Sequence, residues 1–83
     1  MTDTAKQHDT IEAIQNEIYD ALAVNGVFHS PHEGYAVLLE EVDELWAEIT
    51  PKPHLRDRKK IYKEAVQVAA MAARIAIEFG DDA

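Results

Sequence analysis

Two breaks in an otherwise helical pattern constrain the fold of this chain most. The first contains Asn25-Gly26 and Ser30-Pro31, and the second is the sequence TPKP at positions 50–53. Glycine adopts a left-handed conformation easily, and proline disfavours helix at and before its own position. The stretches outside the breaks repeat apolar residues at helical spacing, and none alternates as a strand would. The sequence therefore predicts an all-α chain of three helices.

Capping residues predict where these helices begin and end. The first helix is expected from about Thr10 to Val24, with Asp9 and Glu12 as a capping box and residues 1–8 flexible. The second is expected to begin at Pro31, with Ser30 as its cap, and to end before Pro51. The third is expected to run from near Asp57 to about Phe79, with Gly80 as its stop.

The small size of the chain limits how it can be stabilised. Its 83 residues form a single domain, 1–83, and a chain of this length buries only about 60% of its unfolded surface. Small domains compensate with disulfides, metals or oligomerisation, and this chain has no cysteine. The third predicted helix is apolar over most of its surface and rich in alanine, so two short helices can hardly cover it. We therefore expect a helical bundle formed by homo-oligomerisation, as a homodimer or a homotetramer.

Charge and hydropathy exclude several classes of partner. The net charge of −8 argues against general affinity for a nucleic acid polymer. No uncharged run approaches the roughly 20 apolar residues that span a membrane, and the polar N-terminal sequence MTDTAKQHDT has no apolar signal core. We expect a cytoplasmic protein with no membrane partner. Six of the eight cations nevertheless lie within residues 52–63, which suggests a separate anion site.

The second predicted helix carries an unusual density of acid. The sequence LLEEVDELWAEI, residues 38–49, has five acidic side chains on twelve positions. Like charges at helical spacing repel, so they are either solvated or gathered around a cation. At about 100° per residue, the glutamates fall opposite one broad apolar face that includes Trp46, which favours a solvated strip and a packed tryptophan.

A second acidic element lies in the third predicted helix. Glu64 and Gln67 are one turn apart and face the same way. Because the break before this helix is short, the second and third helices should be antiparallel neighbours whose polar side chains can converge. Mg²⁺ takes oxygen ligands, and helical bundles hold such ions with acidic residues one turn apart on facing helices. A cation site is therefore the alternative to a solvated strip.

Together these two elements resemble those of a known family. The sequence EGYAVLLEEVDELWAEI, followed after a basic connection by RKKIYKEAVQVAAMAARIA, looks like the MazG-type nucleotide pyrophosphohydrolases, in particular their short, phage-type members. These belong to the all-α nucleoside triphosphate pyrophosphatase superfamily. The resemblance covers roughly Glu33 to Glu78, and its motif is a Glu-Glu-x-x-Glu helix followed by a Glu-x-x-Asp helix. It implies hydrolysis of nucleoside triphosphates, (d)NTPs, to monophosphate and pyrophosphate by a homodimer or tetramer that uses Mg²⁺, with Mn²⁺ as a possible substitute.

The resemblance also implies roles for particular residues. By position, the metal would be bound by Glu41, Glu44, Glu64 and Gln67, and the attacking water would be oriented or deprotonated by Glu40 or Glu44. The substrate phosphates would be contacted by four residues of the basic segment, Lys60, Lys63, Arg56 and Arg58. The alternative for this segment is a solvated connection with local pairing, such as Lys60 with Glu64.

One position departs from the family motif, and it keeps other functions open. Gln67 stands where the family has aspartate, and its carbonyl oxygen can coordinate a metal but adds no charge. Two alternatives to the enzyme follow: a non-catalytic nucleotide- or metal-binding module, and a structural helical protein that works through its alanine-rich surface. Elsewhere, His29 and His32 are expected to be a surface pair, and Arg74 is expected to form an ion pair with Glu78 on a polar strip.

Overall fold

The computed structural model describes residues 3–81, which form three long helices. These are α1 (Thr4–Asn25), α2 (Pro31–Ile49) and α3 (Arg58–Phe79), with one short 3₁₀ turn, η1 (Pro53–Leu55), before α3. Residues 3–81 contain no β-strand, so the all-α prediction is confirmed. Within the same range, no helix is both long and apolar enough to cross a membrane.

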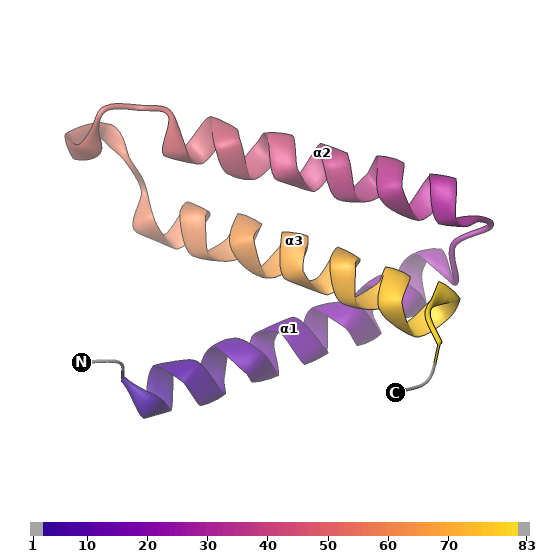
Figure 1. Ribbon diagram of the computed structural model, residues 1–83. Helices are drawn as coiled ribbons and strands as arrows, with labels where there is room; N and C mark the ends of the chain where they lie inside the picture. Colours follow the sequence, from indigo (N-terminus) through magenta and orange to yellow (C-terminus); the bar gives the residue numbers. More distant parts are fainter. Residues whose placement is uncertain (1–2, 82–83) are drawn as a thin grey trace.

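Helix α3 lies between the other two helices (Figure 1). It packs against α2 and against α1, whereas α1 and α2 do not pack against each other. The short connections make α2 and α3 an antiparallel hairpin, as their spacing predicted. α3 therefore forms the floor of a space whose sides are α1 and α2.

Most of the predicted helix boundaries are confirmed, because they depend on local chemistry. Ser30 Oγ accepts a hydrogen bond from the backbone N–H of Glu33 at 3.1 Å and caps α2. The Asp57 carboxylate accepts from the first backbone N–H groups of α3 and caps that helix. Gly26, with φ of 69°, follows the last residue of α1 in a conformation that residues other than glycine rarely adopt.

The predicted start of α1 is wrong. The helix begins at Thr4, six residues before the predicted Thr10, and Asp3 caps it by accepting from the backbone N–H groups of Ala5 and Lys6. Residues 4–8, expected to be flexible, are thus helical, and Asp9 lies inside the helix. Nothing in this segment breaks a helix, so it extends back to the earlier capping residue. Residues 1 and 2 of the predicted flexible segment lie outside the described part of the chain.

The core is small and contains an arginine. Its buried apolar residues are Phe28, Val66, Ala70 and Met71. The predicted ion pair between Arg74 and Glu78 is confirmed, at 3.3 Å. Arg74 is only 3% exposed, however, so the pair lies in the interior and not on a polar strip as predicted.

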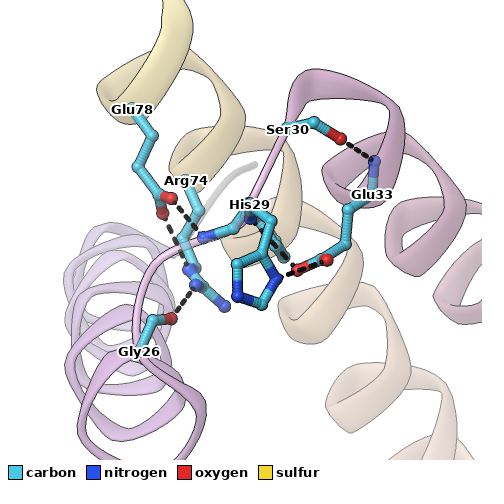
Figure 2. Close-up of polar contacts among 7 residues, drawn as sticks. Gly26, His29, Ser30, Glu33, Arg74 and Glu78 are labelled. Carbon is cyan, nitrogen blue, oxygen red and sulfur yellow. Dashed lines mark hydrogen bonds and ion pairs between the residues drawn. The ribbon is translucent and has the colours of Figure 1, made fainter.

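Arg74 fastens the connection between α1 and α2 onto α3 (Figure 2). Its Nη2 donates to the carbonyl oxygen of Gly26 at 2.7 Å, and its guanidinium lies 4.0 Å from the centre of the Phe28 ring. The second oxygen of Glu78 accepts from the backbone N–H of Phe28 at 2.7 Å. Because three partners share the charge, a buried arginine is tolerated here.

The single broad apolar face predicted for α2 is divided into two. One part, which includes Val37, Leu38 and Leu45, is partly buried on the side that faces α3. The other part is exposed, and within this chain the prediction that Trp46 packs in a core is wrong, because 63% of its surface is accessible. Glu41 belongs to the partly buried side, not to the opposite one as predicted.

Candidate metal centre

Three of the predicted metal ligands come together where α2 faces α3. One carboxylate oxygen from each of Glu41, Glu44 and Glu64 lies within 4.8 Å of the other two. Glu41 and Glu44 are nearly one turn apart on α2, and Glu64 reaches the same point from the neighbouring α3. Glu41 and Glu64 are partly buried, and Glu44 is exposed.

Two oxygens of this group have no partner. Glu41 Oε2 and Glu64 Oε2 are buried, and among the described residues no donor is hydrogen-bonded to either of them. A buried acceptor without a partner is costly, and native structures rarely leave one without a water or an ion. Among residues 3–81, no lysine or arginine forms an ion pair with any of these three glutamates.

The pKa values of Glu41 and Glu64 show the electrostatic cost of placing these carboxylates together. Burial, followed by the charge of Glu44, raises the pKa of Glu41 from 4.5 to about 7. Burial and the nearby carboxylate of Glu44 also raise the pKa of Glu64. Glu17 of α1 adds to the negative potential at Glu41, and Glu48 adds to it at Glu64. A divalent cation among these groups would reverse the sign of that potential.

The donor set fits a hard divalent cation. Mg²⁺ binds oxygen at about 2.1 Å, so neighbouring ligands on one ion lie about 3 Å apart and opposite ones about 4.2 Å apart. Separations within 4.8 Å need only small side-chain rotations to reach those values. Three carboxylates offset a charge of +2 and leave coordination positions for water and for phosphate oxygens.

A cleft adjoins one of the three glutamates, Glu41. It has a volume of about 500 Å³ and lies between α1 and α2 on the floor that α3 provides. Gln67, the fourth predicted ligand, lines this cleft together with Glu41 and Arg74. Glu17 and Asp20 of α1 make that wall of the cleft acidic. Nothing in the sequence of α1 had indicated that it would face the site.

The predicted phosphate-binding residues differ in their exposure and in their hydrogen bonds. Lys63 is exposed and close enough to Glu64 for its charge to oppose the rise in the pKa of that carboxyl. Lys60 is exposed one turn before Glu64, and Arg58 is exposed at the start of α3. Arg56 is differently engaged, because its Nε donates to the carbonyl oxygens of Ile49 and Pro51 at 2.9 and 3.0 Å and so closes the end of α2.

Glu40, the other predicted catalytic residue, is exposed and is not among the three converging glutamates. His29 is also outside the site, and its Nδ1 lies 2.8 Å from Glu33 Oε2 at the start of α2 (Figure 2).

Comparison with known proteins gives no match, whether the chain is compared with profiles of protein families, with curated proteins or with solved structures. The MazG-type resemblance therefore depends on the residues of α2 and α3 described above.

Proposed function

We propose that this chain is a Mg²⁺-dependent nucleoside triphosphate pyrophosphohydrolase of the MazG type, which cleaves (d)NTPs to monophosphate and pyrophosphate. The observation that supports it most is the convergence of Glu41, Glu44 and Glu64 from two helices, with two buried oxygens that lack partners. Solvated carboxylates on a surface would repel one another and spread apart in water.

Each of the nearby residues has a part in this proposal. The three glutamates would hold the ion, and Gln67 would supply a neutral oxygen from the next turn of α3. Mg²⁺, or Mn²⁺ in its place, would offset the negative charge of the triphosphate. Glu44 is the better candidate for orienting the attacking water, because it is exposed and lies in the group that Glu40 does not join.

The remaining parts of the substrate have room in the cleft that Glu41 lines. Lys60 and Lys63 are exposed on the first turns of α3 and would contact phosphate oxygens. The cleft of about 500 Å³ lies within the usual size range of small-molecule sites and would receive the nucleoside. Arg56 is assigned instead to the end of α2, because its Nε already donates to the carbonyl oxygens of Ile49 and Pro51.

The test is a measurement of pyrophosphate release from the four NTPs and the four dNTPs, with Mg²⁺ and with chelator. Glu41→Ala and Glu64→Ala should abolish Mg²⁺-dependent release, and Glu12→Ala, at an exposed position of α1, should leave it unchanged. The proposal fails if wild-type protein releases no pyrophosphate from any of the eight nucleotides.

A second candidate function is a module that binds a nucleotide or a metal without turning it over. Gln67 favours it, because the site holds three carboxylates and the neutral side chain contributes no fourth charge. Calorimetry that detects nucleotide binding in Mg²⁺, together with no product after prolonged incubation, would select this function over hydrolysis.

A third candidate is a purely structural interaction protein. A cation that binds only the folded chain raises its melting temperature by mass action. Wild-type protein should therefore melt at higher temperature in millimolar Mg²⁺ or Mn²⁺, and Glu41→Ala should not. No change with either ion would favour the structural role. Self-association as a homodimer or homotetramer is part of all three proposals, because the core of the single chain is small.

A further inference from the structure

The cleft extends along α3 away from the candidate metal centre. Gln67 lies one turn after Glu64, and Arg74 lies two turns further along the same helix, a distance of about 10 Å along its axis. Gln67 and Arg74 both line the cleft. With the triphosphate at the three glutamates, as proposed above, the nucleoside would extend along this floor toward Arg74.

Arg74 has one guanidinium nitrogen without an oxygen acceptor. Its Nε donates to Glu78 at 3.3 Å, and its Nη2 donates to the carbonyl oxygen of Gly26 at 2.7 Å. Among the described residues, Nη1 is hydrogen-bonded only to the Sδ of Met71, at 4.0 Å, and a thioether sulfur is a weak acceptor. This third nitrogen makes no marked contact with the residues drawn in Figure 2. Because Arg74 is 3% exposed and lines the cleft, a buried donor is left for a ligand there.

Asp20 of α1 supplies an acceptor on the neighbouring wall of the cleft. Helices α1 and α3 run parallel, because Thr10 contacts Tyr62 near their starts and Gly26 contacts Arg74 near their ends. Asp20 lines the cleft less than two turns of α1 before Gly26. Among residues 3–81, no lysine, arginine or histidine forms an ion pair with it. Both oxygens of its carboxylate are therefore open to a donor from a ligand.

The other carboxylates of the cleft are engaged elsewhere. Both oxygens of Glu33 contact His29. Glu41 belongs to the candidate metal centre, and the charge of Glu17 raises the pKa of Glu41, so Glu17 faces that side of the cleft. Asp20 is thus the acidic residue that remains for the part of a ligand near Arg74.

We infer that this cleft selects guanine among the nucleobases, an inference that rests on the proposed function only for the presence of a nucleotide. Guanine presents two acceptors, O6 and N7, beside two donors, N1–H and the 2-amino group. Arg74 Nη1 donates to the acceptor edge, where arginine also recognises guanine in DNA, and the Asp20 carboxylate accepts from the donor pair. The Phe28 ring, 4.0 Å from the guanidinium, and the bonds of Nε and Nη2 hold Nη1 in place before the base arrives.

The other common bases present the wrong groups to these two side chains. Adenine has an amino group where guanine has O6, so a donor would meet the donor Nη1 of Arg74. Cytosine has two acceptors beside its amino group, and uracil and thymine have a single N–H between two carbonyl oxygens. None offers two adjacent N–H groups to one carboxylate, so an acceptor would face Asp20. We expect a preference for guanine of at least about 10-fold.

The test is the affinity of the full chain for GMP, AMP, CMP and UMP in Mg²⁺, measured by calorimetry. Wild-type protein should bind GMP at least about 10-fold more tightly than the other three. Asp20→Asn replaces one acceptor oxygen by an amide N–H₂, which suits xanthine, because xanthine has a carbonyl oxygen in place of the 2-amino group. The variant should lose about 10-fold in affinity for GMP and gain about as much for xanthosine monophosphate. Glu12→Gln, at an exposed position of α1 outside the cleft, should bind like wild type.

A second comparison needs no variant and covers the case in which Asp20→Asn fails to fold. Inosine monophosphate lacks only the 2-amino group, so wild-type protein should bind it about 10-fold more weakly than GMP. The inference is overturned if wild-type protein binds GMP no more tightly than the other monophosphates, or binds none of them. It is also overturned if Asp20→Asn keeps the wild-type preference, or if Glu12→Gln loses it.

Pyrophosphate release from the eight nucleotides separates this inference from the proposed function. Equal release from all bases would leave hydrolysis in place and overturn the selection of guanine. Selective binding of GMP without release of pyrophosphate from any nucleotide would support the selection of guanine and remove hydrolysis.

Discussion

Replacing Glu41 by glutamine should make the metal-free protein more stable above pH 7 and remove its stabilisation by Mg²⁺. Burial and the charge of Glu44 raise the pKa of Glu41 from 4.5 to about 7 in the folded chain. A carboxyl whose pKa is higher in the folded state binds more protons when folded. The free energy of unfolding must therefore fall as the pH rises from about 4.5 to about 7, and it stays low above that pH. Glutamine carries no charge at any pH and avoids this loss.

The size of the effect follows from the same pKa values. The difference between 4.5 and about 7 corresponds to roughly 3 kcal/mol if Glu41 titrates alone. Because Glu41 is only partly buried, solvent screening reduces this figure to about 1–2 kcal/mol. Glu41→Gln should thus raise the free energy of unfolding by about 1–2 kcal/mol at pH 8.5 and by nearly nothing at pH 4, where both side chains are neutral.

Urea denaturation followed by circular dichroism, at pH 4, 6 and 8.5 and one protein concentration, measures this difference. Each curve is recorded in chelator and in 5 mM Mg²⁺. In chelator at pH 8.5 the variant should be the more stable protein, and in Mg²⁺ only wild type should gain stability. Glu12→Gln, at an exposed position of α1, should follow wild type throughout. A Glu41→Gln chain that is less stable than wild type in chelator at pH 8.5 would refute the reasoning.

Three further substitutions test the fold around the site. Arg74→Met should lower the free energy of unfolding by about 3 kcal/mol in urea denaturation, because it removes a buried charge and leaves the partly buried Glu78 without its ionic partner. Gly34→Val should cost at least about 2 kcal/mol in the same assay, since even a Cβ at Gly34 would lie 3.0 Å from Ile75 Cγ1; an equal stability would mean that α2 does not approach α3 so closely. Ser30→Ala should lower the melting temperature through the loss of about 1 kcal/mol of capping energy, and Ser30→Asp should restore it.

The boundaries of α2 and α3 could be predicted because each depends on residues within one turn. Ser30-Pro31, Asp57 and Gly80 act locally, so the sequence contains all the necessary information. The start of α1 could not be decided in the same way. Both Asp3 and Asp9 can cap a helix, and no glycine or proline between them favours the later one. The choice then depends on the length of helix that α3 can support by packing.

The convergence of Glu41, Glu44 and Glu64 was predicted from the sequence, although the faces of α2 were not. Helical periodicity showed an apolar half of α2 but could not show that only part of it packs within the chain. The rest, which includes Trp46, is exposed, and Glu41 lies on the partly buried side. Arg74 shows the same limit, because its burial depends on Gly26 and Phe28, which are nearly fifty residues away.

Metal binding and self-association, both part of the proposed function, would bear on the same contact between α2 and α3. The carboxylates of Glu41 and Glu64 are held together against their own repulsion by the contact between α2 and α3. A partner copy that covered the exposed side of both helices would add contacts that keep them together, and so would stabilise the spacing that a bound ion would require. By linkage, an ion that bound this spacing more tightly would strengthen self-association by the same factor. Mg²⁺ binding and self-association would then both stabilise one helix contact, next to the small core of the single chain.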